Sequence, residues 1–240
     1  LLENTSVRII NTCSTGLNHI DINYCHEHGI EVQSLTNDYD LISSLPSTSE
    51  LAFGLLMSVV RNIPSSHFEV FQKKSWDYTK YIGRQMNALT VGVVGYGRLG
   101  KMYANYCKAF GSKVVVYDPY KDIYDEGIKQ LKSMDELLPI ADVISIHVHV
   151  SHETTNMFSR EYFSKMKNNV LIVNTARGEI INERDLVVFL KENPSAKVAT
   201  DVLANEIKKR MGSPLLKHAL KNENILITQH IIDVSGQLLT

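Results

Sequence analysis

The sequence of 240 residues has little of what marks several large classes of protein. Its three cysteines, Cys13, Cys25 and Cys107, are too few and too scattered for a disulfide framework or a zinc site. The net charge is −1, so no basic excess exists to attract nucleic acid or an anionic membrane. No apolar run approaches the roughly 20 residues that a membrane helix needs. These absences favour a protein of the reducing cytoplasm that binds neither nucleic acid nor membrane.

The first residue is Leu1 rather than Met, and it stands a few residues before an expected strand at 7–10. We therefore expect the native chain to extend beyond residue 1, and leave open whether it extends beyond residue 240. A helix over 21–28 and a short strand over 30–32 follow the first strand. This order predicts that the first segment is part of an α/β domain.

A glycine-rich turn is the most informative motif. Gly95, Gly97 and Gly100 fit the pattern G-x-G-x-x-G, and the β-branched run 91–94 precedes them. A second apolar strand ends at Asp118, which lies 18 residues after Gly100. Such a turn brings the backbone and a helix N-terminus close to a pyrophosphate, and the carboxylate accepts hydrogen bonds from a ribose diol. Because Asp118 would repel a 2′-phosphate, the motif predicts NAD rather than NADP.

From residue 88 onward, expected strands and helices alternate. The strands read as continuous apolar runs, which is typical of parallel strands buried on both faces. Alternation of this kind predicts a doubly wound parallel sheet. The expected strands are 91–94, 114–117, 143–150, 170–174, 197–201 and 225–228, and the expected helices are 101–110, 134–138, 160–166, 183–190 and 215–220.

Three side chains suited to keto-acid reduction follow expected strands. Arg177 comes after the strand that ends at Asn174, Glu206 lies five residues beyond Asp201, and His230 follows the last strand. Ligands of open parallel sheets bind beyond the carboxyl ends of the strands, so these side chains are expected to meet there. Arg177 can bind a carboxylate with its forked guanidinium, His230 can exchange a proton, and Glu206 can orient the imidazole.

The order of motifs resembles the D-isomer-specific 2-hydroxyacid dehydrogenases over nearly the whole chain. The most specific matching string is Asn174-Thr175-Ala176-Arg177-Gly178, and the glycine turn, the sequence around Asp142–Val148, and Thr228–Ile231 match in the same order. The resemblance implies a Rossmann-type doubly wound parallel sheet that binds NAD and a partial flavodoxin-like α/β substrate domain. Residues 1–46 would belong to the substrate domain. Residues 47–240 would form the NAD-binding domain, with dimerisation helices and the start of a return helix.

The same resemblance assigns roles to individual residues. It implies an NAD-dependent oxidoreductase that acts on a small D-2-hydroxy acid or 2-keto acid and that forms a homodimer. The catalytic residues would be Arg177, Glu206 and His230, and Thr15 and Gly16 would bind the substrate. The residues expected to bind the cofactor are Gly95, Tyr96, Gly97, Arg98, Leu99, Gly100, Asp118, His147, Thr175, Ala176 and Asp201.

Several positions depart from the family pattern. Gln229 stands where the family usually has Pro before the histidine, and Ile232 and Asp233 stand where it usually has glycines. His149 and Ile207 also replace prolines. These changes leave the three catalytic side chains in place and leave the identity of the 2-hydroxy acid open.

The sequence leaves one alternative function open and disfavours two others. Some members of this family act as NAD-responsive scaffolds, such as corepressors, with little turnover, and they retain the Arg-Glu-His set. The formate dehydrogenase branch pairs its histidine with Gln, so Glu206 favours hydroxyacid chemistry. A metal site at His147, His149 and His152 is disfavoured, because no carboxylate at ligand spacing completes it.

Overall fold

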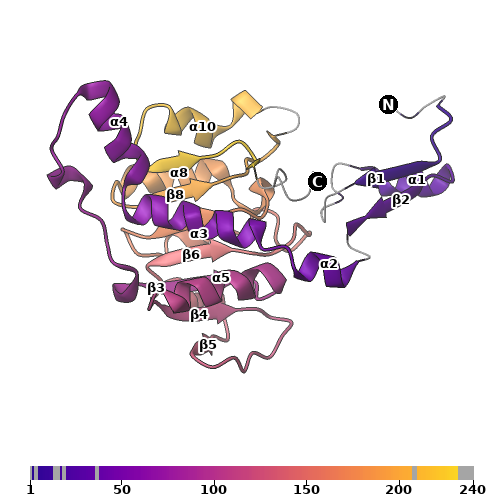
Figure 1. Ribbon diagram of the computed structural model, residues 1–240, viewed down its shortest axis with the longest axis horizontal. Coiled ribbons are helices and arrows are strands. Elements are labelled where there is room, and N and C mark those ends of the chain that lie inside the picture. The colour runs from indigo at the N-terminus through magenta and orange to yellow at the C-terminus, as the bar shows by residue number, and fades with distance from the viewer. Residues whose placement is uncertain are drawn as a thin grey trace. The chain divides into compact units, whose positions relative to one another are not determined.

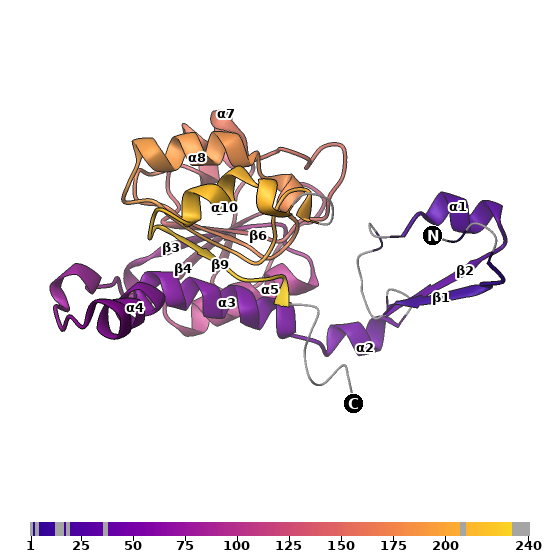
Figure 2. The ribbon, with the colours of Figure 1, turned by 90° about the horizontal axis from the view of Figure 1, so that it is seen from above.

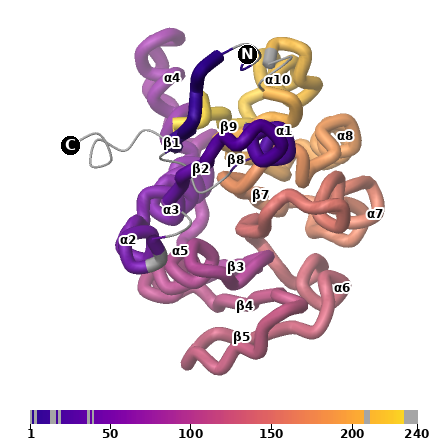
Figure 3. Tube along the Cα trace, turned by 90° about the vertical axis from the view of Figure 1, so that its right-hand side faces the viewer, coloured from indigo at the N-terminus to yellow at the C-terminus, as the bar shows by residue number. Residues whose placement is uncertain are grey.

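The computed structural model describes residues 2, 5–12, 17, 20–35, 38–206 and 210–231. The chain divides into two compact units after Pro46, and each is described by itself. In the first unit, strands β1 (Ile9–Thr12) and β2 (Glu31–Ser34) pair in parallel, with helix α1 (Ile22–Glu27) between them in sequence. Asp21 caps α1 by accepting a hydrogen bond from the Tyr24 N–H. Helix α2 (Tyr39–Ser43) ends this unit (Figure 3).

The second unit is built on a parallel sheet of seven strands in the order β5-β4-β3-β6-β7-β8-β9 (Figure 1). The strands are β3 (Thr90–Val94), β4 (Lys113–Tyr117), β5 (Ile128–Gln130), β6 (Val143–Ile146), β7 (Leu171–Asn174), β8 (Lys197–Thr200) and β9 (Ile225–Ile227). The order runs outward in both directions from the adjacent pair β3 and β6. The predicted doubly wound parallel sheet is thereby confirmed, with its switch point between β3 and β6.

Helices cover both faces of this sheet, as Figure 2 shows. Helices α3 (Ser47–Val60) and α5 (Arg98–Ala109) pack on one face, where Leu56, Tyr103 and Val93 are fully buried. The opposite face carries α6 (Met134–Leu137), α7 (Arg160–Phe163), α8 (Glu183–Glu192) and α10 (Pro214–Ala219). Burial on both faces explains why the strands read as continuous apolar runs in the sequence.

The elements differ from the sequence-based expectations at their ends. Helix α5 begins at Arg98, inside the glycine motif, rather than at Lys101. The strand expected over 143–150 ends at Ile146, so the prediction is wrong beyond that residue. Strand β5 was not predicted, because three residues at a sheet edge give no measurable alternation.

Helix α4 (Ile63–Lys73) and the segment after it carry unusually exposed apolar side chains. Phe71, Trp76, Tyr78 and Ile82 are each more than 60% exposed. No helix among the described residues is long and apolar enough to cross a membrane.

Candidate active site

The glycine turn joins β3 to α5, and its shape depends on missing side chains. Gly95 has a φ of +90°, and a Cβ atom there would lie 2.6 Å from the His147 carbonyl oxygen. A Cβ atom on Gly100 would lie 2.1 Å from the Gly95 carbonyl oxygen, so only glycine lets α5 start this close to the strand. Gly97, in contrast, has open space above its Cα. The turn therefore packs against protein atoms at Gly95 and Gly100, and has free space beside it at Gly97.

Asp118 follows β4 beside this turn. Its Oδ2 accepts a hydrogen bond from the Tyr96 N–H at 2.8 Å, and its Oδ1 accepts one from the Tyr120 N–H at 3.0 Å. Both bonds leave further lone pairs on the carboxylate oxygens. The structure thus places the predicted ribose acceptor against the predicted pyrophosphate turn.

His147 follows β6 on the other side of the turn. Its Nε2 lies 2.8 Å from the Ser145 hydroxyl, and its ring lies 4.9 Å from the ring of Tyr103. Burial lowers the pKa of His147 to about 3, so the imidazole is neutral at neutral pH. A neutral ring at this position supports the turn by packing rather than by charge.

The loop after β7 presents Arg177 through a network that Asn174 organises. The Asn174 side chain accepts a hydrogen bond from the Ala176 N–H at 3.0 Å and donates one to the Arg177 carbonyl at 2.9 Å. One guanidinium nitrogen of Arg177 donates to the Ala176 carbonyl at 2.7 Å. The guanidinium has five N–H groups, so donors remain for a ligand.

Gly178 brings this loop against the loop after β8. A Cβ atom on Gly178 would lie 2.0 Å from the Leu203 carbonyl carbon and 2.3 Å from the Ala204 nitrogen. This contact is possible only with glycine, and it sets the Arg177 loop beside the segment that carries Glu206. Neither Asn174 nor Gly178 was singled out for a role from the sequence, although both belong to the most specific matching string.

Glu206 and His230 are in direct contact. Glu206 Oε1 accepts a hydrogen bond from His230 Nδ1, and its Oε2 accepts one from the Leu203 N–H at 3.1 Å. Burial alone would raise the pKa of Glu206. The bonds from His230 and Leu203 and the nearby charge of Arg177 outweigh burial and hold this pKa below its ordinary value. The three predicted catalytic side chains are therefore close enough to act on one another.

Asp201 has a structural role that the sequence did not reveal. It is 1% exposed, and its Oδ1 accepts hydrogen bonds from the Thr228 hydroxyl and, at 3.0 Å, from the Ile231 N–H. These bonds tie the end of β8 to the segment on either side of His230. His230 itself has a φ of +57°, which such anchoring helps to hold.

Some predicted residues cannot be assessed in the same way. Thr15 and Gly16, the predicted substrate ligands, lie outside the described residues, as do Ile207, Ile232 and Asp233. Gln229 is exposed next to His230. In the part of the chain that the structure describes, no group of three His, Cys, Asp or Glu side chains could hold a metal ion.

The residues at this edge of the sheet fit a dinucleotide. The open space over Gly97 admits a pyrophosphate to the start of α5, where the first N–H groups of the helix have no partner within the helix. Thr175, at the end of β7, is 2% exposed, and its hydroxyl has no hydrogen-bond partner. An orphaned buried hydroxyl between the glycine turn and Arg177 is well placed to bind a polar group of a ligand.

Comparison with known proteins gives consistent matches. Residues 53–231 match the family described as D-isomer specific 2-hydroxyacid dehydrogenase, NAD binding domain. D-3-phosphoglycerate dehydrogenase of Bacillus subtilis is 31% identical over 231 residues, which cover 95% of this chain and 41% of that protein. Hydroxypyruvate reductase of Thermotoga maritima is also 31% identical, over 94% of this chain and 71% of that protein.

The solved structures agree with these matches. D-lactate dehydrogenase from Aquifex aeolicus, complexed with NAD and lactic acid, superposes with a TM-score of 0.81 at 31% identity. The match covers 97% of this chain and 72% of that one. D-2-hydroxyisocaproate dehydrogenase superposes with a TM-score of 0.84 at 24% identity, which shows a shared fold. The chain spans 41% of the length of the D-3-phosphoglycerate dehydrogenases named first among its relatives.

Proposed function

Because the chain belongs to the D-isomer-specific 2-hydroxyacid dehydrogenase family and carries its NAD-binding domain, we propose that it is an NAD-dependent oxidoreductase that interconverts a small D-2-hydroxy acid and its 2-keto acid. The observation that carries the proposal is the contact of Glu206 with His230 beside Arg177, at the edge of the sheet where the glycine turn also lies. Bound NAD supplies or accepts the hydride.

Arg177 binds the acid and polarises its carbonyl in this proposal. The substrate is an anion with a keto group next to its carboxylate, and the forked guanidinium can contact oxygens of both groups. The bond from Arg177 to the Ala176 carbonyl holds the side chain in place before the substrate arrives. The predicted substrate ligands Thr15 and Gly16 would add backbone N–H groups from residues 1–46, which we assign to a partial substrate domain.

His230 exchanges the proton. An ionised Glu206 carries no hydrogen, so its bond with His230 fixes the hydrogen on Nδ1 and assigns proton exchange to Nε2. During reduction Nε2 donates a proton to the carbonyl oxygen, and during oxidation it accepts the hydroxyl proton. The negative charge of Glu206 stabilises the protonated imidazole, which is the form required for reduction.

The cofactor is assigned to the eleven predicted residues around the glycine turn, with residues 47–240 as the NAD-binding domain. Asp118 would accept hydrogen bonds from the adenosine ribose, and its charge would disfavour the 2′-phosphate of NADP. Thr175 and Ala176 would contact the nicotinamide half, and Asp201 would hold its carboxamide as well as the His230 segment.

We also propose a cytoplasmic homodimer. The exposed apolar side chains of α4 and the segment after it, Phe71 and Trp76 among them, provide an interface for a second copy of the chain. The described cysteines, Cys25 and Cys107, are buried free thiols, which suits a reducing compartment.

Turnover of 2-keto acids tests this function. NADH oxidation is followed at 340 nm with glyoxylate, pyruvate, hydroxypyruvate, branched 2-keto acids and phosphohydroxypyruvate, and with NADPH in parallel. We expect turnover of at least one compound with NADH and much less with NADPH. Tight NADH binding without turnover of any compound would contradict the proposal and favour an NAD-responsive scaffold.

A further inference from the structure

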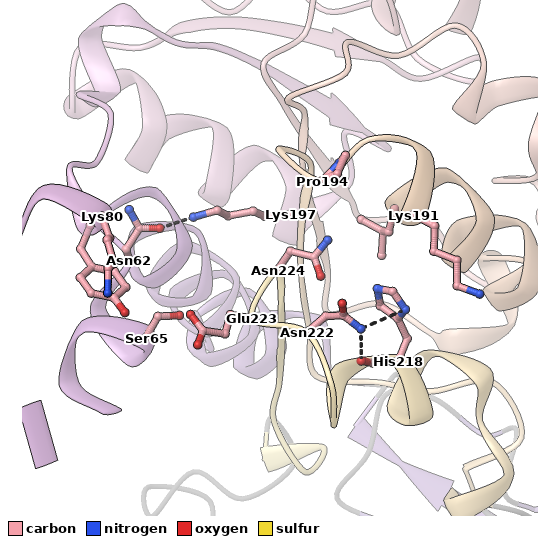
Figure 4. A pocket seen from close by; sticks show the side chains of 12 residues that line it. Asn62, Ser65, Lys80, Lys191, Pro194, Lys197, His218, Asn222, Glu223 and Asn224 are labelled. Carbon is pink, nitrogen blue, oxygen red and sulfur yellow. Dashed lines mark hydrogen bonds between the residues drawn. The ribbon is translucent and has the colours of Figure 1, made fainter. Parts of the chain in front are cut away.

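A cavity lies away from the candidate active site, on the side of the sheet where the strands begin. Its volume is about 460 Å³, and it adjoins the amino ends of β8 and β9 (Figure 4). Lys197, the first residue of β8, and Asn224, which precedes β9, line it from the sheet. Asn62, at the start of α4, and His218, on α10, line it from the helices. Ligand pockets in proteins span about 300–1,000 Å³, so the cavity is large enough for a small molecule.

Lys197 is an unbalanced positive charge in this cavity. It is only partly exposed, and burial lowers its pKa. Its ammonium donates to the side-chain oxygen of Asn62, toward which it points in Figure 4. No carboxylate of the described residues lies within ion-pair distance of it. A neutral amide compensates a desolvated cation poorly, so an anion beside Lys197 would be stabilised.

His218 adds a buried donor to the lining. The Asn222 amide nitrogen lies 3.3 Å from His218 Nδ1, and because that nitrogen is a donor, Nδ1 is the acceptor. The hydrogen of the neutral imidazole is therefore on Nε2, which is buried and interacts with the side chain of Asn224. Burial and, to a smaller extent, the charge of Lys191 lower the pKa of His218, while the interaction with Asn224 opposes this shift.

The carboxylates nearby are already matched by cations. Glu223 lies 3.5 Å from Lys73, and Glu69, a buried residue of α4, lies 3.1 Å from both Lys73 and Lys80. The charges of Lys191 and Lys197 have no such match among the described ion pairs. The lining therefore carries a surplus of positive charge, with a buried imidazole donor beside it.

We propose that this cavity binds a small multivalent oxyanion, a phosphate or a phosphate ester, with Lys197 and the His218 Nε2–H as its principal contacts. The Ser65 hydroxyl lines the same cavity and can donate to a further oxygen. The site is separate from the predicted pyrophosphate turn, since the cavity lies at the amino ends of the strands and the turn lies at their carboxyl ends. The proposed anion binding therefore does not depend on whether the dehydrogenase reaction takes place.

Phosphate titration at saturating NADH tests this proposal. The NADH occupies the predicted pyrophosphate turn, so that added phosphate does not bind there. Isothermal titration with inorganic phosphate, with chloride at matched ionic strength as the reference, is expected to detect binding to the wild type. Lys197→Gln is expected to weaken that binding at least 10-fold. The matched control Lys129→Gln changes an exposed lysine of β5 and should bind as the wild type does. Equal NADH affinity of all three proteins verifies that each is folded.

A second measurement needs no variant. Phosphate should slow the acylation of Lys197 by a lysine reagent several-fold, and should leave acylation of Lys129 unchanged. Absence of phosphate binding by the wild type, equal binding by Lys197→Gln, or equal protection of both lysines would overturn the proposal.

Discussion

Glu206 binds His230 Nδ1 with one carboxylate oxygen and the Leu203 N–H, at 3.1 Å, with the other. The carboxylate is thus fixed at both oxygens, and the imidazole is oriented by a group that is itself held by the backbone. In Glu206→Gln an amide oxygen can still accept from Nδ1, but the negative charge is lost.

We therefore expect Glu206→Gln to reduce kcat for keto-acid reduction about 10-fold or more, with little change in NADH affinity. Loss of the charge makes the protonated imidazole less stable, so the pH at which reduction declines should move to lower values. The measurement is the pH profile of kcat/KM for both proteins. An unchanged profile would show that Glu206 does not act through His230.

Arg177→Ala is expected to lower kcat/KM at least 100-fold while NADH binds as before. The guanidinium is proposed to contact the substrate, and the Asn174 bonds that shape its loop use backbone atoms that the substitution keeps. Arg184→Ala, an exposed arginine on α8, is the matched control and should behave as the wild type does. Normal kcat/KM in Arg177→Ala would remove the residue from the proposed mechanism.

Asp118→Asn is expected to narrow the preference for NADH over NADPH by about 10-fold. The amide oxygen can accept one of the two bonds that the Tyr96 and Tyr120 N–H groups donate to the carboxylate, and the substitution removes the charge that repels a 2′-phosphate. Steady-state kinetics with both cofactors measures the ratio. A ratio equal to that of the wild type would mean that another group selects the cofactor.

The lowered pKa of Glu69, a residue of α4, predicts that the stability of the protein depends on pH. Hydrogen bonds from Lys73 and Lys80 are the main reason that its pKa is lowered from 4.5 to about 2. A carboxyl with a lowered folded-state pKa contributes stability above pH 4.5, and this contribution is lost as the pH falls toward 2. Glu69→Gln should therefore lower the urea midpoint at pH 7, and its difference from the wild type should shrink between pH 4.5 and 2.

The control for this prediction is Glu161→Gln, which removes an exposed i,i+4 partner of Lys165. Exposed pairs of this kind contribute little, so its midpoint should stay near that of the wild type at each pH. A constant difference between Glu69→Gln and the wild type at all pH values would contradict the assigned ionisation.

The sequence predicted the sheet and its glycine turn because their signals are local. Buried parallel strands form continuous apolar runs. Gly95 and Gly100 form a motif of fixed short spacing, and Gly100 packs against Gly95 itself. The edge strand β5 has three residues and is too short for a pattern of its own, and the early end of β6 is set by pairing with β3 and β7, so no local pattern revealed either feature.

In the candidate site, too, the local signals were predictable and the contacts between distant parts of the chain were not. The carboxyl-edge rule gave the places of Arg177, Glu206 and His230, because it needs only the order of the strands. The rule could not show that Asp201 anchors the His230 segment. Those hydrogen bonds join residues that are 27 and 30 positions apart in the sequence and meet only in the folded chain. The contact of Gly178 with Leu203 is likewise visible only once β7 and β8 are paired.

The most direct test of the account compares NADH oxidation by the wild type and by His230→Gln with the 2-keto acid that the wild type turns over fastest. Both proteins are assayed at saturating NADH, and NADH affinity is measured separately by fluorescence. We predict equal NADH affinity and a loss of kcat of about 100-fold or more in the variant, because glutamine cannot exchange a proton with the substrate. Turnover by His230→Gln at the rate of the wild type would contradict the assignment of proton transfer to this histidine.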